Sequence, residues 1–66
     1  MPLIFRASSR AAAEDVSRRL RSDGFLARAS CRGSAALVIV NCIRSEYDTV
    51  KQRAQRIDPT ARLLAA

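Results

Sequence analysis

Residues 36–42 have the sequence Ala-Leu-Val-Ile-Val-Asn-Cys, the most strongly β-prone stretch of the chain. Its nearly continuous apolar run is typical of a central strand that is buried on at least one face. Arg32-Gly33-Ser34, just before it, is a tight-turn signal. Residues 25–31, before the turn, alternate apolar residues with Leu26, Arg28 and Ser30. We therefore predict a β-hairpin formed by strands 25–31 and 36–42.

A helix is predicted on the N-terminal side of this hairpin, over residues 9–23. The segment is rich in Ala, Arg and Leu, which favour helices, and Ser8-Ser9 supplies an N-cap. Gly24 follows it and is typical of a C-terminal cap. One apolar stripe at helical spacing lies along the segment: Ala13, Val16 and Leu20.

A second helix is predicted after the hairpin. Ser45-Glu46-Tyr47-Asp48 resembles a capping box with Asp in place of the preferred Glu. Asp58-Pro59 ends the helix, because the residue before a proline is disfavoured in the helical region. Its apolar stripe comprises Tyr47, Val50, Ala54 and Ile57.

Short apolar runs at residues 3–7 and 61–65 complete the pattern as the first and last strands. The order β-α-β-β-α-β predicts an α+β fold, a ferredoxin-like sandwich. Its four-stranded antiparallel sheet would carry both helices on one face. The length of 66 residues suits a single α+β domain over residues 1–66.

The first half of the chain also resembles a known family of this topology. Residues 8–14, Ser-Ser-Arg-Ala-Ala-Ala-Glu, and residues 20–28, Leu-Arg-Ser-Asp-Gly-Phe-Leu-Ala-Arg, look like the first half of SPOR domains. Those domains are βαββαβ modules that bind peptidoglycan in bacterial division proteins. The resemblance covers about a third of the chain. Val40-Asn41-Cys42-Ile43 replaces the Gly-containing end of the third strand that is usual there, so the resemblance implies the fold and not the function.

One face of the predicted sheet has no helix to cover it. If the tight turn pairs Ala29 with Val38, side-chain alternation turns Leu3, Phe5 and the apolar members of the hairpin toward the helices. This register keeps Arg6 and Arg28 out of the core, whereas a slip of one residue would exchange the two faces. The opposite face then carries Ile4, Arg6, Leu26, Arg28, Leu37, Ile39, Asn41, Arg62 and Leu64.

This uncovered face combines branched apolar side chains with arginines, which is typical of a protein interface. The binding residues predicted on it are Ile4, Arg6, Leu26, Arg28, Leu37, Ile39 and Arg62. We expect a small regulatory adaptor or inhibitor that docks on a larger protein or protein complex, or on a second copy as a homodimer. In the alternative, the arginine stems merely cover the leucines and isoleucines and nothing docks there.

Nucleic-acid binding is a second reading of the charge, because eleven Arg and one Lys outnumber six acids and leave a net charge of +6. No aromatic residue lies on the third strand, and Phe5 is expected to face the helices, so base stacking is not predicted. Binding would rest on phosphate contacts from Arg6, Arg28, Arg32, Arg44, Arg53, Arg56 and Arg62.

Catalytic, metal and cofactor sites are not predicted. The chain has no His, and Cys31 and Cys42 do not have the spacing of zinc ligands. Met1-Pro2 resembles the start of tautomerases, in which Pro2 would act as a catalytic base, although the long strand at 36–42 departs from their shorter β-α-β plan. With no export signal or long apolar run, we expect a cytoplasmic protein without a membrane partner.

Overall fold

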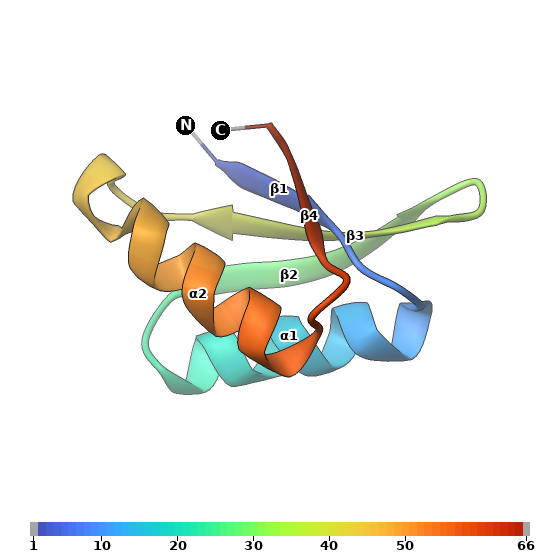
Figure 1. Cartoon of the computed structure of the whole chain (residues 1–66), viewed down its shortest axis with the longest axis horizontal. Coiled ribbons are helices and arrows are strands. Elements are labelled where there is room, and N and C mark those ends of the chain that lie inside the picture. The colour runs from blue at the N-terminus through green and yellow to red at the C-terminus, as the bar shows by residue number, and fades with distance from the viewer. Residues whose placement is uncertain (1, 66) are drawn as a thin grey trace.

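The computed structural model describes residues 2–65 and contains a four-stranded antiparallel sheet (Figure 1). The strands are β1 (Leu3–Arg6), β2 (Leu26–Arg32), β3 (Ala35–Asn41) and β4 (Arg62–Ala65). Their order across the sheet is β2-β3-β1-β4. The hairpin strand β3 and the N-terminal strand β1 are therefore the two central strands. The α+β class and the antiparallel sheet predicted from the sequence are confirmed.

Two α-helices lie together on the same side of this sheet, as Figure 1 shows. They are α1 (Arg10–Ser22) and α2 (Tyr47–Ile57), and a 3₁₀ turn, η1 (Arg44–Glu46), precedes α2. Helix α1 packs against β2 and β3 and also contacts α2. No helix within residues 2–65 is long and apolar enough to cross a membrane. Among residues 2–65 no element covers the opposite face of the sheet.

The hairpin has the predicted register, because Ala29 is paired with Val38. Both strands are displaced by one residue from the predicted ranges, so that Arg32 is the last residue of β2 and pairs with Ala35. The turn is thus reduced to Gly33-Ser34. Gly33 has a φ of +59°, in the left-handed region that glycine adopts without a steric penalty.

The start of α1 also follows the prediction. The Ser9 hydroxyl accepts a hydrogen bond of 3.0 Å from the Ala12 backbone N–H. This satisfies one of the free N–H groups of the first turn. At the other end, Gly24 follows the C-cap Asp23 with a φ of +94°. The two ends of α1 were therefore predicted by capping chemistry alone.

The start of the second helical segment differs from the prediction. The Glu46 carboxylate accepts a 3.1 Å hydrogen bond from the Ile43 N–H, and the Glu46 N–H donates to the Ile43 carbonyl at 2.9 Å. These reciprocal bonds replace the predicted box between Ser45 and Asp48. They begin the 3₁₀ turn two residues earlier, and α2 begins only at Tyr47.

The core lies between the two helices and the sheet. It receives alternate residues from the strands and the apolar stripe from each helix. Phe5 and Leu20, from β1 and α1, are completely buried, as are Val38 and Val40 on β3. The core members are Leu3, Phe5, Ala7, Ala13, Val16, Leu20, Ala27, Ala36, Val38, Val40, Val50 and Ala54.

A buried carboxylate ties the two loops below the sheet together. Asp58, which follows α2, accepts a 2.8 Å hydrogen bond from the Ser8 backbone N–H, just before α1. Its other oxygen accepts from the Thr60 N–H at 3.2 Å and from the Thr60 hydroxyl at 2.8 Å. Asp58 is only 5% exposed, and these bonds replace the water it loses. The entry to α1 is thereby fixed to the exit from α2.

Candidate functional site: the open face of the sheet

The sheet face that points away from both helices is called the open face here, and the predicted binding residues lie on the strands that form it. Register and alternation turn Leu3, Phe5, Val38 and Val40 into the core, where each is at most 1% exposed. Their neighbours along the strands point the other way. Arg6, Leu26, Arg28 and Arg62 are exposed, and Ile4, Leu37 and Ile39 are half-buried.

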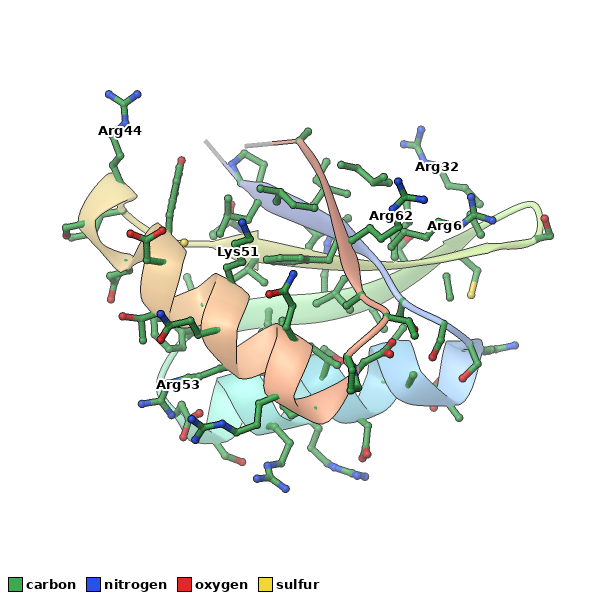
Figure 2. All side chains as sticks on the ribbon, viewed as in Figure 1. Arg6, Arg32, Arg44, Lys51, Arg53 and Arg62 are labelled. Carbon is green, nitrogen blue, oxygen red and sulfur yellow. The ribbon has the colours of Figure 1, made fainter. Side chains whose placement is uncertain are left out.

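Three arginines gather at one end of the open face. Arg6 on β1 is directly opposite Arg62 on β4. Arg32 is the last residue of β2, which is separated from β1 by β3. Ser30 of β2 lies in the same row across the sheet as Leu37 and Arg6, and Arg32 is two residues beyond Ser30, on the same face. Figure 2 shows the three side chains in the same region of the molecule, on the side away from the helices. We call Arg6, Arg32 and Arg62 the arginine triad.

Arg32 was predicted as a phosphate contact in the nucleic-acid alternative but was not among the binding residues predicted on the open face. The prediction ended the strand at Cys31 and placed Arg32 in the turn, where its side chain has no assigned direction. In the structure β2 continues through Arg32. The alternation that places Leu26 and Arg28 on the open face places Arg32 there as well. The signal was available in the two-residue spacing of these positions.

Most of the net charge of the molecule lies on this face. The four strand arginines are Arg6, Arg28, Arg32 and Arg62, and within the described residues no acidic residue lies on a strand. Helices and loops carry eight basic and six acidic residues, which leaves +2 there and +4 on the strands out of the total of +6. Along the sequence the positive charge is evenly spread, and it is the fold that separates it.

The ion pairs recorded for residues 2–65 all belong to the helical side. Arg10 pairs with Glu14 at 3.7 Å, and Arg18 pairs with Asp15. Arg53 on α2 contacts Asp23, the C-cap of α1, at 2.7 Å. None of these pairs uses an arginine of the open face. Within the described residues the three arginines of the triad are exposed, and no recorded ion pair neutralises them.

The other end of the open face forms an apolar groove of about 310 Å³ at the outer side of β2. Leu26, 72% exposed, and Ile39 provide its aliphatic surface. Arg28 is paired with Ile39 across the strands. Arg21 closes the groove from α1 by donating a 2.9 Å hydrogen bond to the Ala27 carbonyl. The open face is thus divided into an apolar end and an arginine end.

The last strand departs from the predicted alternation. Arg62 faces Arg6 and Leu63 faces Phe5, but Ile4 is paired with Ala65, because the register shifts between Ile4 and Phe5. Leu64 is the additional residue of this irregularity and is 55% exposed. Such a bulge changes the local direction of a strand. The pairing gives Leu64 no single partner, so its position on the open face stays a prediction.

The seven arginines predicted to contact phosphates do not share one surface. Arg6, Arg32 and Arg62 lie at one end of the molecule, whereas Arg44 and Arg53 extend from η1 and α2 in other directions (Figure 2). Arg53 is also held by Asp23. A long nucleic-acid strand would therefore contact only part of the predicted set at one time.

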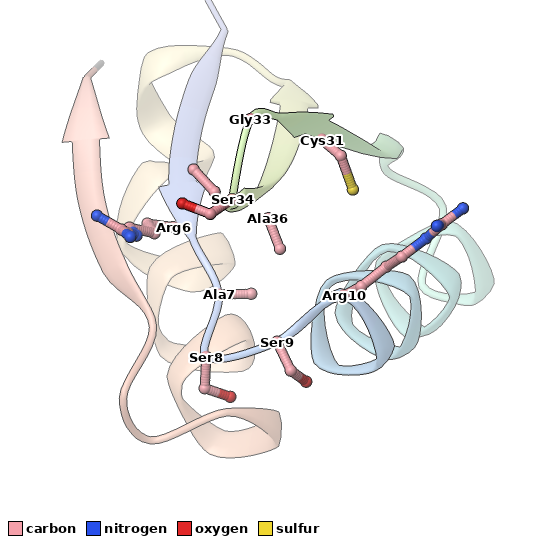
Figure 3. Close-up of a pocket in the computed structure, with 10 residues that line it drawn as sticks. Arg6, Ala7, Ser8, Ser9, Arg10, Cys31, Gly33, Ser34 and Ala36 are labelled. Carbon is pink, nitrogen blue, oxygen red and sulfur yellow. The ribbon is translucent and has the colours of Figure 1, made fainter.

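A second cavity, also of about 310 Å³, lies between the hairpin turn and the start of α1 (Figure 3). Its walls include Ser8, Ser9, Cys31 and Gly33. Two of these wall residues already have structural partners: Ser9 caps α1, and the Ser8 N–H binds Asp58. Arg6 also lines this cavity, and in Figure 3 its side chain extends toward β4.

The two thiols lie at opposite ends of the hairpin and are both free. Cys31 is paired with Ala36, and Cys42 follows the other end of β3. Cys42 is six positions beyond Ala36 along an extended segment, a separation of roughly 20 Å. Burial, followed by the negative charge of Glu46, raises the pKa of the Cys42 thiol above its ordinary value. Within residues 2–65 no cluster of metal-ligating side chains is present.

No protein-family model matches the chain, and no curated protein sequence is significantly similar to it. The resemblance to SPOR domains therefore stays a prediction.

Proposed function

We propose that this protein is a small, non-catalytic binding module that docks through its open face on a larger protein or protein complex, as an adaptor or inhibitor. The observation that carries the proposal is the groove formed by Leu26 and Ile39 beside arginines with no carboxylate among them. Aliphatic anchors with neighbouring arginines are typical of interface centres. Such a surface fits a partner with apolar side chains and an acidic rim.

A second copy of the chain fits this face less well. A two-fold contact between open faces would bring both sets of four arginines together without a carboxylate to pair with them. Contact between like charges makes the free energy of association less favourable by roughly several kcal/mol. The charge therefore favours a different, acidic partner over the homodimer.

The ferredoxin-like arrangement is our inference for the frame that presents this face. It is supported by the strand order, in which β3 separates β1 from β2 and β1 separates β3 from β4. Each β-α-β unit thus has a strand of the other unit inserted between its own two strands.

The proposal is tested by pull-down of cross-linked partners from lysate of the source organism, with Leu26→Asp and Ile39→Glu as the variants. Leu26 is well exposed, so its replacement leaves the core intact and should remove the partner bands. Lys51→Glu, an exposed change of charge on α2, is the matched control and should retain them. Equal recovery by all the folded proteins would contradict the proposal.

Nucleic-acid binding is the second candidate, favoured by the +4 charge of the strands. Phe5 is buried and Phe25 packs against the core, so stacking on these rings is not expected. Fluorescence anisotropy of labelled DNA and RNA at several salt concentrations decides this case. Binding that persists near physiological salt with a steep log–log slope would favour it, and binding only at very low salt would exclude it.

A further inference from the structure

We propose that the arginine triad is a binding site for a phosphoryl group carrying two negative charges. This goes beyond the docking function and does not depend on it, because the triad lies at the other end of the open face from the apolar groove. Figure 2 shows the three labelled side chains at this end.

The geometry brings the three guanidinium groups within reach of one ligand. Directly opposed residues such as Arg6 and Arg62 have Cα atoms about 5 Å apart. Arg32 is two strands and two residues away from Arg6, a Cα separation of roughly 12 Å. Arg32 and Arg62 lie on opposite edge strands, with Cα atoms roughly 16 Å apart, so an anion must lie above β3 and β1, midway between them, for the extended side chains of all three arginines to reach it.

The charge balance favours a phosphoryl group over a carboxylate. The triad carries +3 and no recorded ion pair within residues 2–65 uses it. A carboxylate offers one charge and two oxygens, which one bidentate arginine can satisfy. A phosphate monoester carries about −1.5 to −2 charges and three strong acceptor oxygens, so it can engage three guanidinium groups.

The backbone around the triad is well suited to hold these side chains in place. Arg6 lies on a central strand, between Leu37 and Arg62 in its row. Arg32 lies at the end of a hairpin closed by a two-residue turn, in which Gly33 has the left-handed conformation. Rigid elements lower the entropy lost when a ligand orders its contacts.

The test is calorimetric titration of the folded protein with inorganic pyrophosphate and, separately, with citrate, a tricarboxylate of similar charge. We expect pyrophosphate to bind about tenfold more tightly or better, because charge-assisted bonds to three arginines are available to it. Arg62→Gln and Arg32→Gln should each lower the affinity for pyrophosphate about tenfold. Arg56→Gln, an exposed arginine of α2, is the control and should change the affinity less than twofold.

Equal affinity for citrate and pyrophosphate, which carry similar charge, would overturn the proposal, because simple charge attraction would then explain the binding. An effect of Arg56→Gln as large as that of Arg62→Gln would overturn it too. The phosphoryl group can belong to a modified protein side chain or to a free phosphate compound, and a glycine peptide containing phosphoserine distinguishes the two. Tighter binding of this peptide than of pyrophosphate indicates a modified side chain. Weaker binding of the peptide indicates a free phosphate compound. Leu26→Asp should leave pyrophosphate binding unchanged, which keeps this test separate from that of the docking function.

Discussion

Asp58 illustrates how one side chain supports two loops. Its carboxylate accepts three hydrogen bonds, one from the Ser8 backbone and two from Thr60. Burial raises the pKa of Asp58, but the bonds donated by Ser8 and Thr60 outweigh it and hold the pKa below its ordinary value. The charged form is therefore the one that the fold stabilises.

We expect Asp58→Ala to lower the free energy of unfolding by about 2–3 kcal/mol, since it leaves the Ser8 and Thr60 donors without their carboxylate. Urea denaturation at neutral pH measures the loss. Glu14→Gln, at an exposed carboxylate on α1, is the control and should change stability by less than about 0.5 kcal/mol. A loss no larger than the control's would show that Asp58 is not a structural clamp.

The lowered pKa of Asp58 also predicts a dependence of stability on pH. The folded state holds this group more strongly ionised than the unfolded state does, so its contribution is complete above the unfolded pKa. It is lost as the pH falls through the folded pKa. As the pH is lowered from 7, the melting temperature should therefore fall less steeply for Asp58→Asn than for the wild type. Parallel curves would contradict the assignment.

Arg62 predicts an opposition between stability and ligand binding. Arginines directly opposite each other destabilise the β1–β4 pairing. In the absence of anions Arg62→Gln should stabilise the fold by roughly 0.3 kcal/mol. The same substitution should weaken the binding of pyrophosphate. Chemical denaturation at low salt measures the gain. A clear loss of stability in this variant would mean that Arg62 has a structural role.

At the scale of the element, α1 depends on its first turn. Ser9→Ala removes the hydroxyl that accepts from the Ala12 N–H and should cost about 1 kcal/mol of stability. Ser34→Ala is the control, because Ser34 is exposed in the hairpin turn and its hydroxyl takes part in none of the hydrogen bonds recorded for residues 2–65. Equal losses in the two variants, measured by urea denaturation, would contradict the capping role of Ser9.

How far the elements could be predicted depended on the range of the interactions that form them. The register of β2 and β3 follows from a tight turn and from alternation, both of which are local. The 3₁₀ turn before α2 was missed, because Glu46 and the backbone of Ile43 compete with the capping pattern that begins at Ser45. Arg6 and Arg62 meet through strand pairing between the two ends of the chain. No local pattern predicts that contact.

The whole molecule is governed by the separation of charge between its two sides. With +4 on the strands, self-repulsion across the open face opposes folding at low salt. We expect the melting temperature to rise as salt increases toward 0.2 M, where the Debye length falls below about 10 Å. A variant combining Arg32→Gln and Arg62→Gln should respond less. If the melting temperatures of the wild type and the double variant rise equally with salt, the repulsion does not come from Arg32 and Arg62.

The contact between Arg21 and the Ala27 carbonyl has a consequence for concentrated solutions. β2 is hydrogen-bonded to a strand on one side only, and an exposed strand of this kind is a template for fibrous aggregation. The guanidinium group of Arg21 occupies one carbonyl of this edge strand, that of Ala27, and places a positive charge beside it. The helix that carries Arg21 thus serves the solubility of the protein as well as its core.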